Sequence, residues 1–163
     1  MYNITIRWYG DEDPVTLDKI KQFPVVTGIV SDLFDIPVGE VWPYKRIMKL
    51  KNRIESDELK LSAIESIPVH EDIKLGLKTR DKYIDNYVES LKNAGKAGVD
   101  IVVYNFMPVF DWLRSDLDHE NPDGSSSLAY EHDKLVNLDF EKDLKDMPAW
   151  AGYYTKDDLR ELM

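Results

Sequence analysis

The chain has 163 residues, a formal net charge of −10 and an apolar fraction of 43%, enough for a folded domain with its own core. The negative charge disfavours binding to nucleic acid or to an anionic membrane surface, because both require a basic surface. The sequence contains no cysteine, and no apolar run approaches the roughly 18 residues that span a bilayer. Because no secretory signal pattern follows Met1, we expect a cytoplasmic protein.

Short apolar or β-branched runs alternate with amphipathic segments along the chain. The runs predict strands over 3–9, 26–32, 61–67 and 100–106. Helices are predicted over 14–22, 43–56 and 80–95, with Asp13, Pro43 and Thr79 at their starts. Apolar spacing gives their expected buried sides: Leu17, Ile20 and Phe23, then Ile47, Leu50 and Ile54, then Ile84, Tyr87, Leu91 and Ala94.

Strands that alternate with helices imply right-handed crossovers and a parallel sheet. No Gly-x-Gly-x-x-Gly pattern follows the first strand, which disfavours a dinucleotide-binding domain and favours a (β/α) barrel. Four βα units make half of an eight-fold barrel, which takes about 250 residues. We therefore expect residues 1–163 to be the N-terminal half of a single (β/α)₈ TIM-barrel domain, with a long lid-like loop at about 107–154.

Polar side chains follow the carboxyl ends of the predicted strands, the end at which such barrels build their active sites. Arg7 lies near the end of the first strand and Asn105 near the end of the fourth. Pro68 stops the third strand because it lacks an N–H donor, and the chain then presents His70 and Glu71. We expect Arg7, His70 and Asn105 to converge on one opening.

Five blocks of the sequence resemble mannonate dehydratases: Arg7–Gly10, Asp13–Leu17, Asp35–Gly39, Ile64–Lys74 and Tyr104–Trp112. The resemblance implies a xylose-isomerase-like TIM barrel that dehydrates D-mannonate to 2-keto-3-deoxy-D-gluconate in glucuronate catabolism. It also implies Mn²⁺ or Fe²⁺ as cofactor. The similarity covers only about the first half of the family's usual length, so we expect the metal ligands beyond residue 163 and none in this segment.

Removal of water from a sugar acid needs a base, an acid for the departing hydroxyl and a cation for the carboxylate. By the resemblance, His70 is the catalytic candidate, acting on a substrate hydroxyl or shuttling a proton. The substrate-binding candidates are Arg7, Trp8, Glu71 and Asn105. Each has a structural alternative: an internal ion pair for Arg7, core packing for Trp8, a cap or a contact that orients His70 for Glu71, and a backbone brace for Asn105.

Two other functions stay open at this point. One is a sugar isomerase or epimerase on the same barrel, and the other is a non-catalytic half-barrel that binds sugar acids; strand patterns do not separate these from a dehydratase. The expected partners are a small sugar acid and a second copy of the chain in a homo-oligomer, a dimer, but neither nucleic acid nor membrane. We expect the segment to be inactive without the rest of the enzyme.

Overall fold

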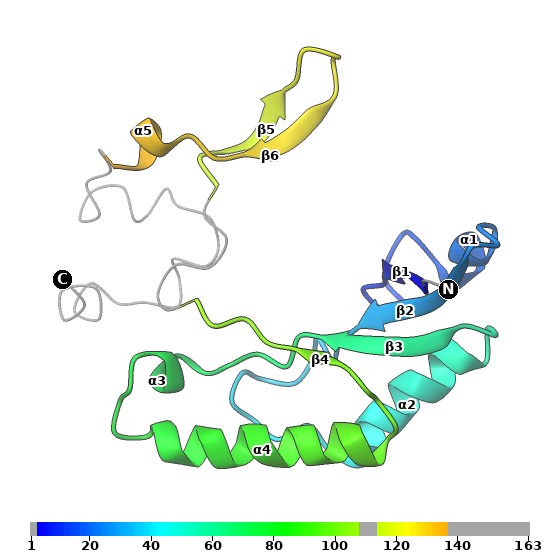
Figure 1. Ribbon diagram of the computed structural model, residues 1–163, viewed down its shortest axis with the longest axis vertical. Helices are drawn as coiled ribbons and strands as arrows, with labels where there is room; N and C mark the ends of the chain where they lie inside the picture. The colour runs from blue at the N-terminus through cyan, green and yellow to red at the C-terminus, as the bar shows by residue number, and fades with distance from the viewer. Residues whose placement is uncertain (1–2, 108–113, 137–163) are drawn as a thin grey trace. The chain divides into compact units, whose positions relative to one another are not determined.

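The computed structural model describes residues 3–107 and 114–136, and the chain forms two compact units, Met1–Phe106 and Met107–Met163. The strands of the first unit are β1 (Ile4–Arg7), β2 (Val26–Ser31), β3 (Lys60–Glu65) and β4 (Val102–Val103). Its helices are α1 (Leu17–Lys21), α2 (Tyr44–Glu55), α3 (Glu71–Lys74) and α4 (Arg80–Lys96). Figure 1 shows this alternation along the chain.

The four strands form one parallel sheet in the order β1-β2-β3-β4. Ile6 pairs with Ile29, Ile29 with Leu61, and Ile64 with Val102, so apolar side chains stand next to one another across the sheet. The predicted α/β class and the parallel pairing of successive strands are confirmed. Because all four strands run the same way, their carboxyl ends lie at one edge of the sheet.

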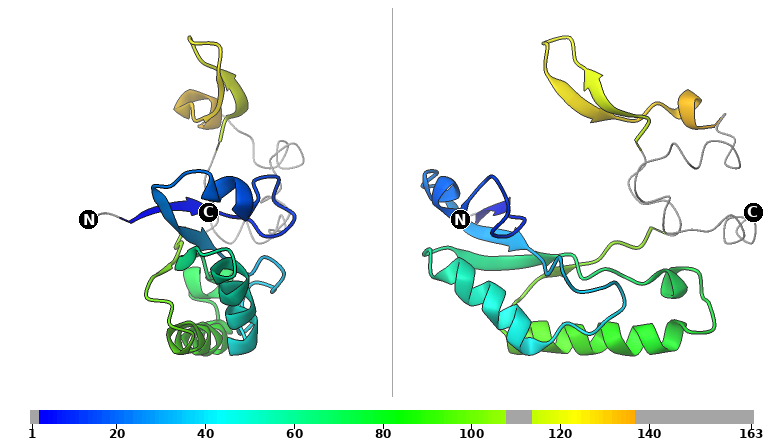
Figure 2. Two further views of the ribbon diagram at one scale, coloured as in Figure 1. Left: turned by 90° about the vertical axis from the view of Figure 1, so that its right-hand side faces the viewer. Right: turned by 180° about the vertical axis from the view of Figure 1, so that it is seen from behind.

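The core lies between the sheet and its helices. Ile29 and Ile64 of the sheet and Ile47 and Ile54 of α2 are all 0% exposed. Burial of such side chains is worth about 1.5–3 kcal/mol each. Helices α2 and α4 lie on the same side of β3 in both views of Figure 2, and the core cluster includes residues from all three elements.

Helix α4 buries only part of the face that apolar spacing predicts: Ala94 is 1% exposed within the core and Tyr87 packs against the core. Ile84 and Leu91 are 39% and 38% exposed, whereas Ser90 and Asn93 are buried. The backbone N–H of Trp42 donates to Ser90 Oγ at 2.9 Å, and Asn93 Nδ2 donates to the carbonyl oxygen of Trp42 at 3.0 Å. Ser90 and Asn93 are buried because they form hydrogen bonds to the loop before α2.

One predicted helix start is wrong. The first helix begins after Thr16 rather than Asp13, because the Asp13 carboxylate accepts from the backbone N–H of Val15 and holds a local turn. Phe23, just beyond this helix, is 59% exposed rather than buried. The predicted start of the third helix is confirmed, because Thr79 is the N-cap residue of α4, although its hydroxyl bonds the carboxylate of Asp72 rather than the helix backbone.

The fourth strand is much shorter than predicted, since regular pairing covers only Val102–Val103. It pairs with β3 on one side and has no second neighbour among the strands of the described residues. A strand with one partner has fewer ladder hydrogen bonds to extend it. The described residues contain no helix long and apolar enough to cross a membrane.

The second unit contains an antiparallel hairpin, where the sequence predicts only loop. Strands β5 (Asp116–Glu120) and β6 (Ser126–Ala129) pair across a turn with Gly124 at φ +81°, and α5 (His132–Leu135) follows. The Asn-Pro-Asp-Gly sequence at this turn is a hairpin signal. Residues 108–113 and 137–154 of the predicted lid-like loop lie outside the described residues.

Candidate functional site

A charged cluster lies at the carboxyl ends of β1, β2 and β3. Arg7, the last residue of β1, places its Nη2 2.8 Å from Oδ2 of Asp32, the residue after β2. Its Nη1 donates to the backbone oxygen of Glu65 and lies 3.9 Å from the Glu65 carboxylate. The internal ion pair weighed for Arg7 is therefore present. A guanidinium has five donors, so Arg7 keeps others for a ligand.

Two aromatic rings flank the Arg7 guanidinium. Its central carbon lies 5.0 Å from the centre of the Tyr9 ring and 5.8 Å from that of Phe34. These distances are in the range of cation–π attraction, which favours a fixed guanidinium position. Tyr9 and Phe34 are 60% and 52% exposed. The cluster therefore presents a held cation between accessible apolar surfaces, an arrangement suited to a small anion with a carbon skeleton.

Asp32 is a site residue that the sequence analysis does not single out. Burial raises the pKa of its carboxyl to about 6, while the neighbouring Arg7 guanidinium opposes that shift. Its Oδ1 and Nε of Arg7 are buried and have no hydrogen-bond partner among the described residues. In the sequence, the signal that points to Asp32 is its position at the end of an apolar strand, where Arg7 also lies.

Asn105 lies two residues beyond β4 and contacts the end of β3. Its Nδ2 donates to Oγ of Ser66 at 3.3 Å. Arg7 also contacts the end of β3, through Glu65. Arg7 and Asn105 thus meet the adjacent residues Glu65 and Ser66 from opposite sides of β3 in the strand order. His70 lies on the same chain segment but makes a separate set of contacts.

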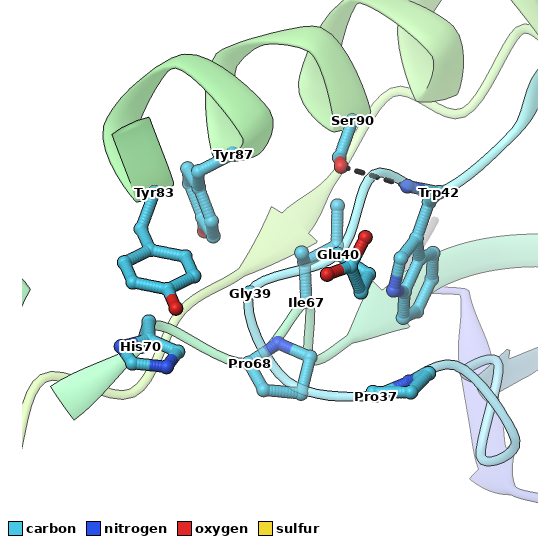
Figure 3. A pocket seen from close by; sticks show the side chains of 10 residues that line it. All are labelled: Pro37, Gly39, Glu40, Trp42, Ile67, Pro68, His70, Tyr83, Tyr87 and Ser90. Carbon is cyan, nitrogen blue, oxygen red and sulfur yellow. Dashed lines mark hydrogen bonds between the residues drawn. The ribbon is translucent and has the colours of Figure 1, made fainter. Parts of the chain in front are cut away.

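His70 is held by two interactions just before α3. It is the N-cap residue of α3, and its Nδ1 accepts from the backbone N–H of Asp72 at 3.1 Å. Its ring stacks on that of Tyr83 from α4, with centroids 3.6 Å apart and planes 6° apart. Figure 3 shows the two rings facing each other beside Gly39. The imidazole is therefore fixed in both position and orientation.

The hollow beside His70 is small. It is bounded by the loop before α2, by the segment after β3 and by α4, with Trp42, Ile67 and Tyr87 among its walls (Figure 3). Its volume is about 10 Å³, room for about one water molecule. A six-carbon sugar acid does not fit there. Any substrate would meet the exposed side of His70, whose side chain is 23% exposed.

The two remaining candidates have mainly structural contacts. Trp8 is 2% exposed and belongs to the core cluster, which matches its core-packing alternative. Glu71 Oε1 lies 2.6 Å from Nζ of Lys74 within α3, while its Oε2 is buried and has no partner among the described residues. Neither the indole of Trp8 nor Oε2 of Glu71 is accessible to a ligand here.

Known proteins resemble this chain over nearly its whole length. The family model described as D-mannonate dehydratase (UxuA) matches residues 2–163. The chain belongs to the mannonate dehydratase family. It is 50% identical over 160 residues to a mannonate dehydratase of Streptococcus uberis and 48% identical over 160 residues to one of Streptococcus agalactiae serotype Ia. Each alignment covers 98% of this chain and 46% of the relative.

A solved structure is also similar, the crystal structure of mannonate dehydratase from Streptococcus suis serotype 2. The TM-score is 0.83 at 47% sequence identity, over 99% of this chain and 47% of that chain. This chain therefore spans about half the length of the mannonate dehydratases that it matches. The resemblance inferred from the five sequence blocks is confirmed.

A divalent metal, which the family resemblance implies, does not fit the described part of this chain. Within residues 3–107 and 114–136, no group of three or more His, Asp or Glu side chains is placed to hold an ion. His70 and Asp72 face each other across 3.4 Å, but the carboxylate of Asp72 also bonds Thr79.

Proposed function

We propose that the complete protein is a mannonate dehydratase, a hydro-lyase that converts D-mannonate to 2-keto-3-deoxy-D-gluconate and water. Family membership over residues 2–163 carries this proposal. We also propose that the parallel sheet is the first half of a (β/α)₈ barrel within one domain, since four βα units of such a barrel form an open sheet of this order. The ligands of Mn²⁺ or Fe²⁺ then come from residues beyond Met163.

The reaction removes the proton on the carbon beside the carboxylate and the hydroxyl on the next carbon, which leaves as water. Arg7 supports binding of the carboxylate, because its guanidinium is held between Tyr9 and Phe34 and keeps unused donors. Asn105 binds a hydroxyl through its amide, and His70 faces a hydroxyl from the exposed side of its ring. Glu71 is the remaining substrate-binding candidate, since its side chain is 31% exposed.

The first experiment measures product formation by the complete protein with D-mannonate and added Mn²⁺. Formation of the 2-keto-3-deoxy acid supports the proposal. Interconversion of sugars without loss of water would instead establish an isomerase or epimerase, and binding without turnover would establish a non-catalytic half-barrel. The 163-residue segment alone should not turn over mannonate; turnover by that segment in the presence of a chelator contradicts the proposed placement of the metal site.

The second experiment tests His70 in the complete protein. His70→Ala should lower kcat by about 10²-fold or more and change KM less, because a group that acts on a leaving hydroxyl works in the transition state. The matched control is His132→Ala, since His132 is exposed and its imidazole forms a hydrogen bond only with Tyr130 OH among the described residues. An effect of His70→Ala on KM alone would make His70 a binding residue.

A further inference from the structure

The two nitrogens of the His70 imidazole have different surroundings. Nδ1 accepts from the backbone N–H of Asp72 at 3.1 Å. A backbone N–H can only donate, so the ring nitrogen that accepts from it carries no proton. In the neutral imidazole the proton therefore lies on Nε2. No group of the described residues forms a hydrogen bond with Nε2, and the side chain is 23% exposed.

A competing arrangement would place the proton on Nδ1, facing the carboxylate of Asp72. Oδ1 of Asp72 is 3.4 Å from Nδ1, farther than the backbone nitrogen. The other carboxylate oxygen of Asp72 accepts from the hydroxyl of Thr79. The N-cap geometry of His70, with φ −64° and ψ 145°, aligns Nδ1 with the backbone N–H. The backbone N–H of Asp72, which is closer to Nδ1 and is held at the start of α3, therefore determines the tautomer.

Tyr83 fixes the plane of the His70 ring. It lies near the start of α4, and its ring is parallel to the imidazole at a centroid separation of 3.6 Å. Figure 3 shows the phenol ring covering one face of His70. A stacked partner restricts rotation of the imidazole about its side-chain bonds, because any other rotamer loses the ring contact.

Gly39 closes the edge of this stack. An added Cβ at Gly39 would lie 2.7 Å from Cδ2 of His70 and 2.7 Å from Cδ1 of Tyr83, so no side chain fits there. Its φ of +86° also favours glycine. Asn86 of α4 donates to the carbonyl oxygen of Gly39 at 2.8 Å. The same helix thus places the Tyr83 ring and anchors the glycine that borders it.

We propose that Tyr83 is a positioning residue for His70, and that Tyr83, Gly39 and the Asp72 backbone together present His70 as a neutral Nε2–H donor. The proposal rests on the proposed function, since the acceptor is a substrate hydroxyl oxygen. In this form His70 donates a hydrogen bond to the oxygen through Nε2–H. It does not act as a base through Nε2, because that nitrogen already bears the proton.

The tautomer is measured by ¹⁵N NMR of the complete protein labelled at histidine, at pH 8, where an ordinary imidazole is neutral. His70→Gln identifies the signals of His70 by their loss. We expect an unprotonated nitrogen signal for Nδ1 and a protonated one for Nε2. A protonated Nδ1 with an unprotonated Nε2 overturns the proposal. This readout does not depend on turnover, so it stands even if the complete protein fails to dehydrate mannonate.

Kinetics of the complete protein separate a positioning role for Tyr83 from a structural one. Tyr83→Leu should lower kcat by about 5- to 10-fold, the effect of losing one stacked ring pair. In a His70→Ala background the same substitution should change kcat less than about 2-fold, because the positioned group is already gone. Tyr83→Phe keeps the ring and should retain kcat. Equal losses in both backgrounds, or a loss with Phe as large as with Leu, overturn the proposal.

Two glycines provide a matched pair of variants. Gly39→Ala should lower kcat and shift the His70 ¹⁵N signals, because its Cβ enters the ring stack. Gly98→Ala carries a similar backbone change, at φ +74°, but its Cβ meets only the flexible end of Lys51 at 3.1 Å. It should leave both readouts unchanged. Unchanged His70 signals in a folded Gly39→Ala protein contradict the proposed stack; if that variant does not fold, the Tyr83 variants decide.

Discussion

Replacement of Arg7 by methionine removes the cation that faces Asp32 and keeps the apolar part of the side chain. Two interactions are lost. Arg7 Nη2 lies 2.8 Å from the Asp32 carboxylate, and Nη1 donates to the backbone oxygen of Glu65. The side chains of Arg7 and Asp32 are 28% and 13% exposed, so the pair is largely shielded from water. The variant leaves a shielded carboxylate without its counter-charge.

The expected loss of stability depends on pH. The lost hydrogen bond to Glu65 costs about 1 kcal/mol at any pH. Leaving a buried charge unpaired costs about 3–5 kcal/mol, and the partial exposure of this pair reduces that to about 2. The second cost applies only when Asp32 is ionised. We therefore expect Arg7→Met to lower the free energy of unfolding by about 3 kcal/mol at pH 8 and by about 1 at pH 5.

The direction of this pH dependence follows from the pKa of the Asp32 carboxyl. Burial raises it to about 6 from 3.8, and loss of Arg7 raises it further. Between pH 3.8 and about 6, the folded state keeps a proton on Asp32 that the unfolded state has released. The contribution of Asp32 to the free energy of unfolding therefore falls as the pH rises toward and through about 6. At pH 5 Asp32 is mostly protonated in the variant, and the charge penalty is absent.

The assay is urea unfolding followed by tryptophan fluorescence, at pH 5 and at pH 8. The matched control is Arg46→Met, which breaks the pair of Arg46 with Asp35 at 2.6 Å, where the side chains are 43% and 62% exposed. The Arg46 hydrogen bond lowers the pKa of Asp35, so Asp35 is ionised at both pH values. The control should show no difference between them. An equal loss at pH 5 and pH 8 for Arg7→Met would refute the reasoning.

Two further substitutions test the packing around the sheet. Gly28→Ala should destabilise the protein by about 1–3 kcal/mol, because its Cβ would lie 2.1 Å from Oγ of Ser62. The second substitution Ser62→Gly, in the same chain, should restore stability in urea unfolding. If it does not, the clash is not the cause of the loss. Ser90→Ala should cost about 1–3 kcal/mol by leaving the buried N–H of Trp42 without its acceptor. The control is Ser56→Ala, because the exposed hydroxyl of Ser56 bonds a backbone oxygen. A loss of stability for Ser90→Ala no larger than that for Ser56→Ala would contradict this prediction.

The sequence by itself determined the fold class, the parallel strand pairing and the family. Apolar runs such as 26–32 and 61–67 mark strands covered on both faces, and the helices between them force parallel crossovers. These signals are local in sequence, so they can be read without coordinates. The same holds for the His70 segment, because a proline that ends a strand leaves the next residues at the sheet's carboxyl edge.

Only the tertiary structure decided which side chains meet. Asp32 faces Arg7 across 25 positions of sequence, and Ser90 meets Trp42 across 48. Ser90 and Asn93 of α4 are buried because they bond loop backbone, and apolar spacing does not identify such positions. A hydrogen bond between distant residues leaves no periodic trace in the sequence. The placement of Tyr83 against His70 is of this kind, since it depends on how α4 packs beside the loop at Gly39.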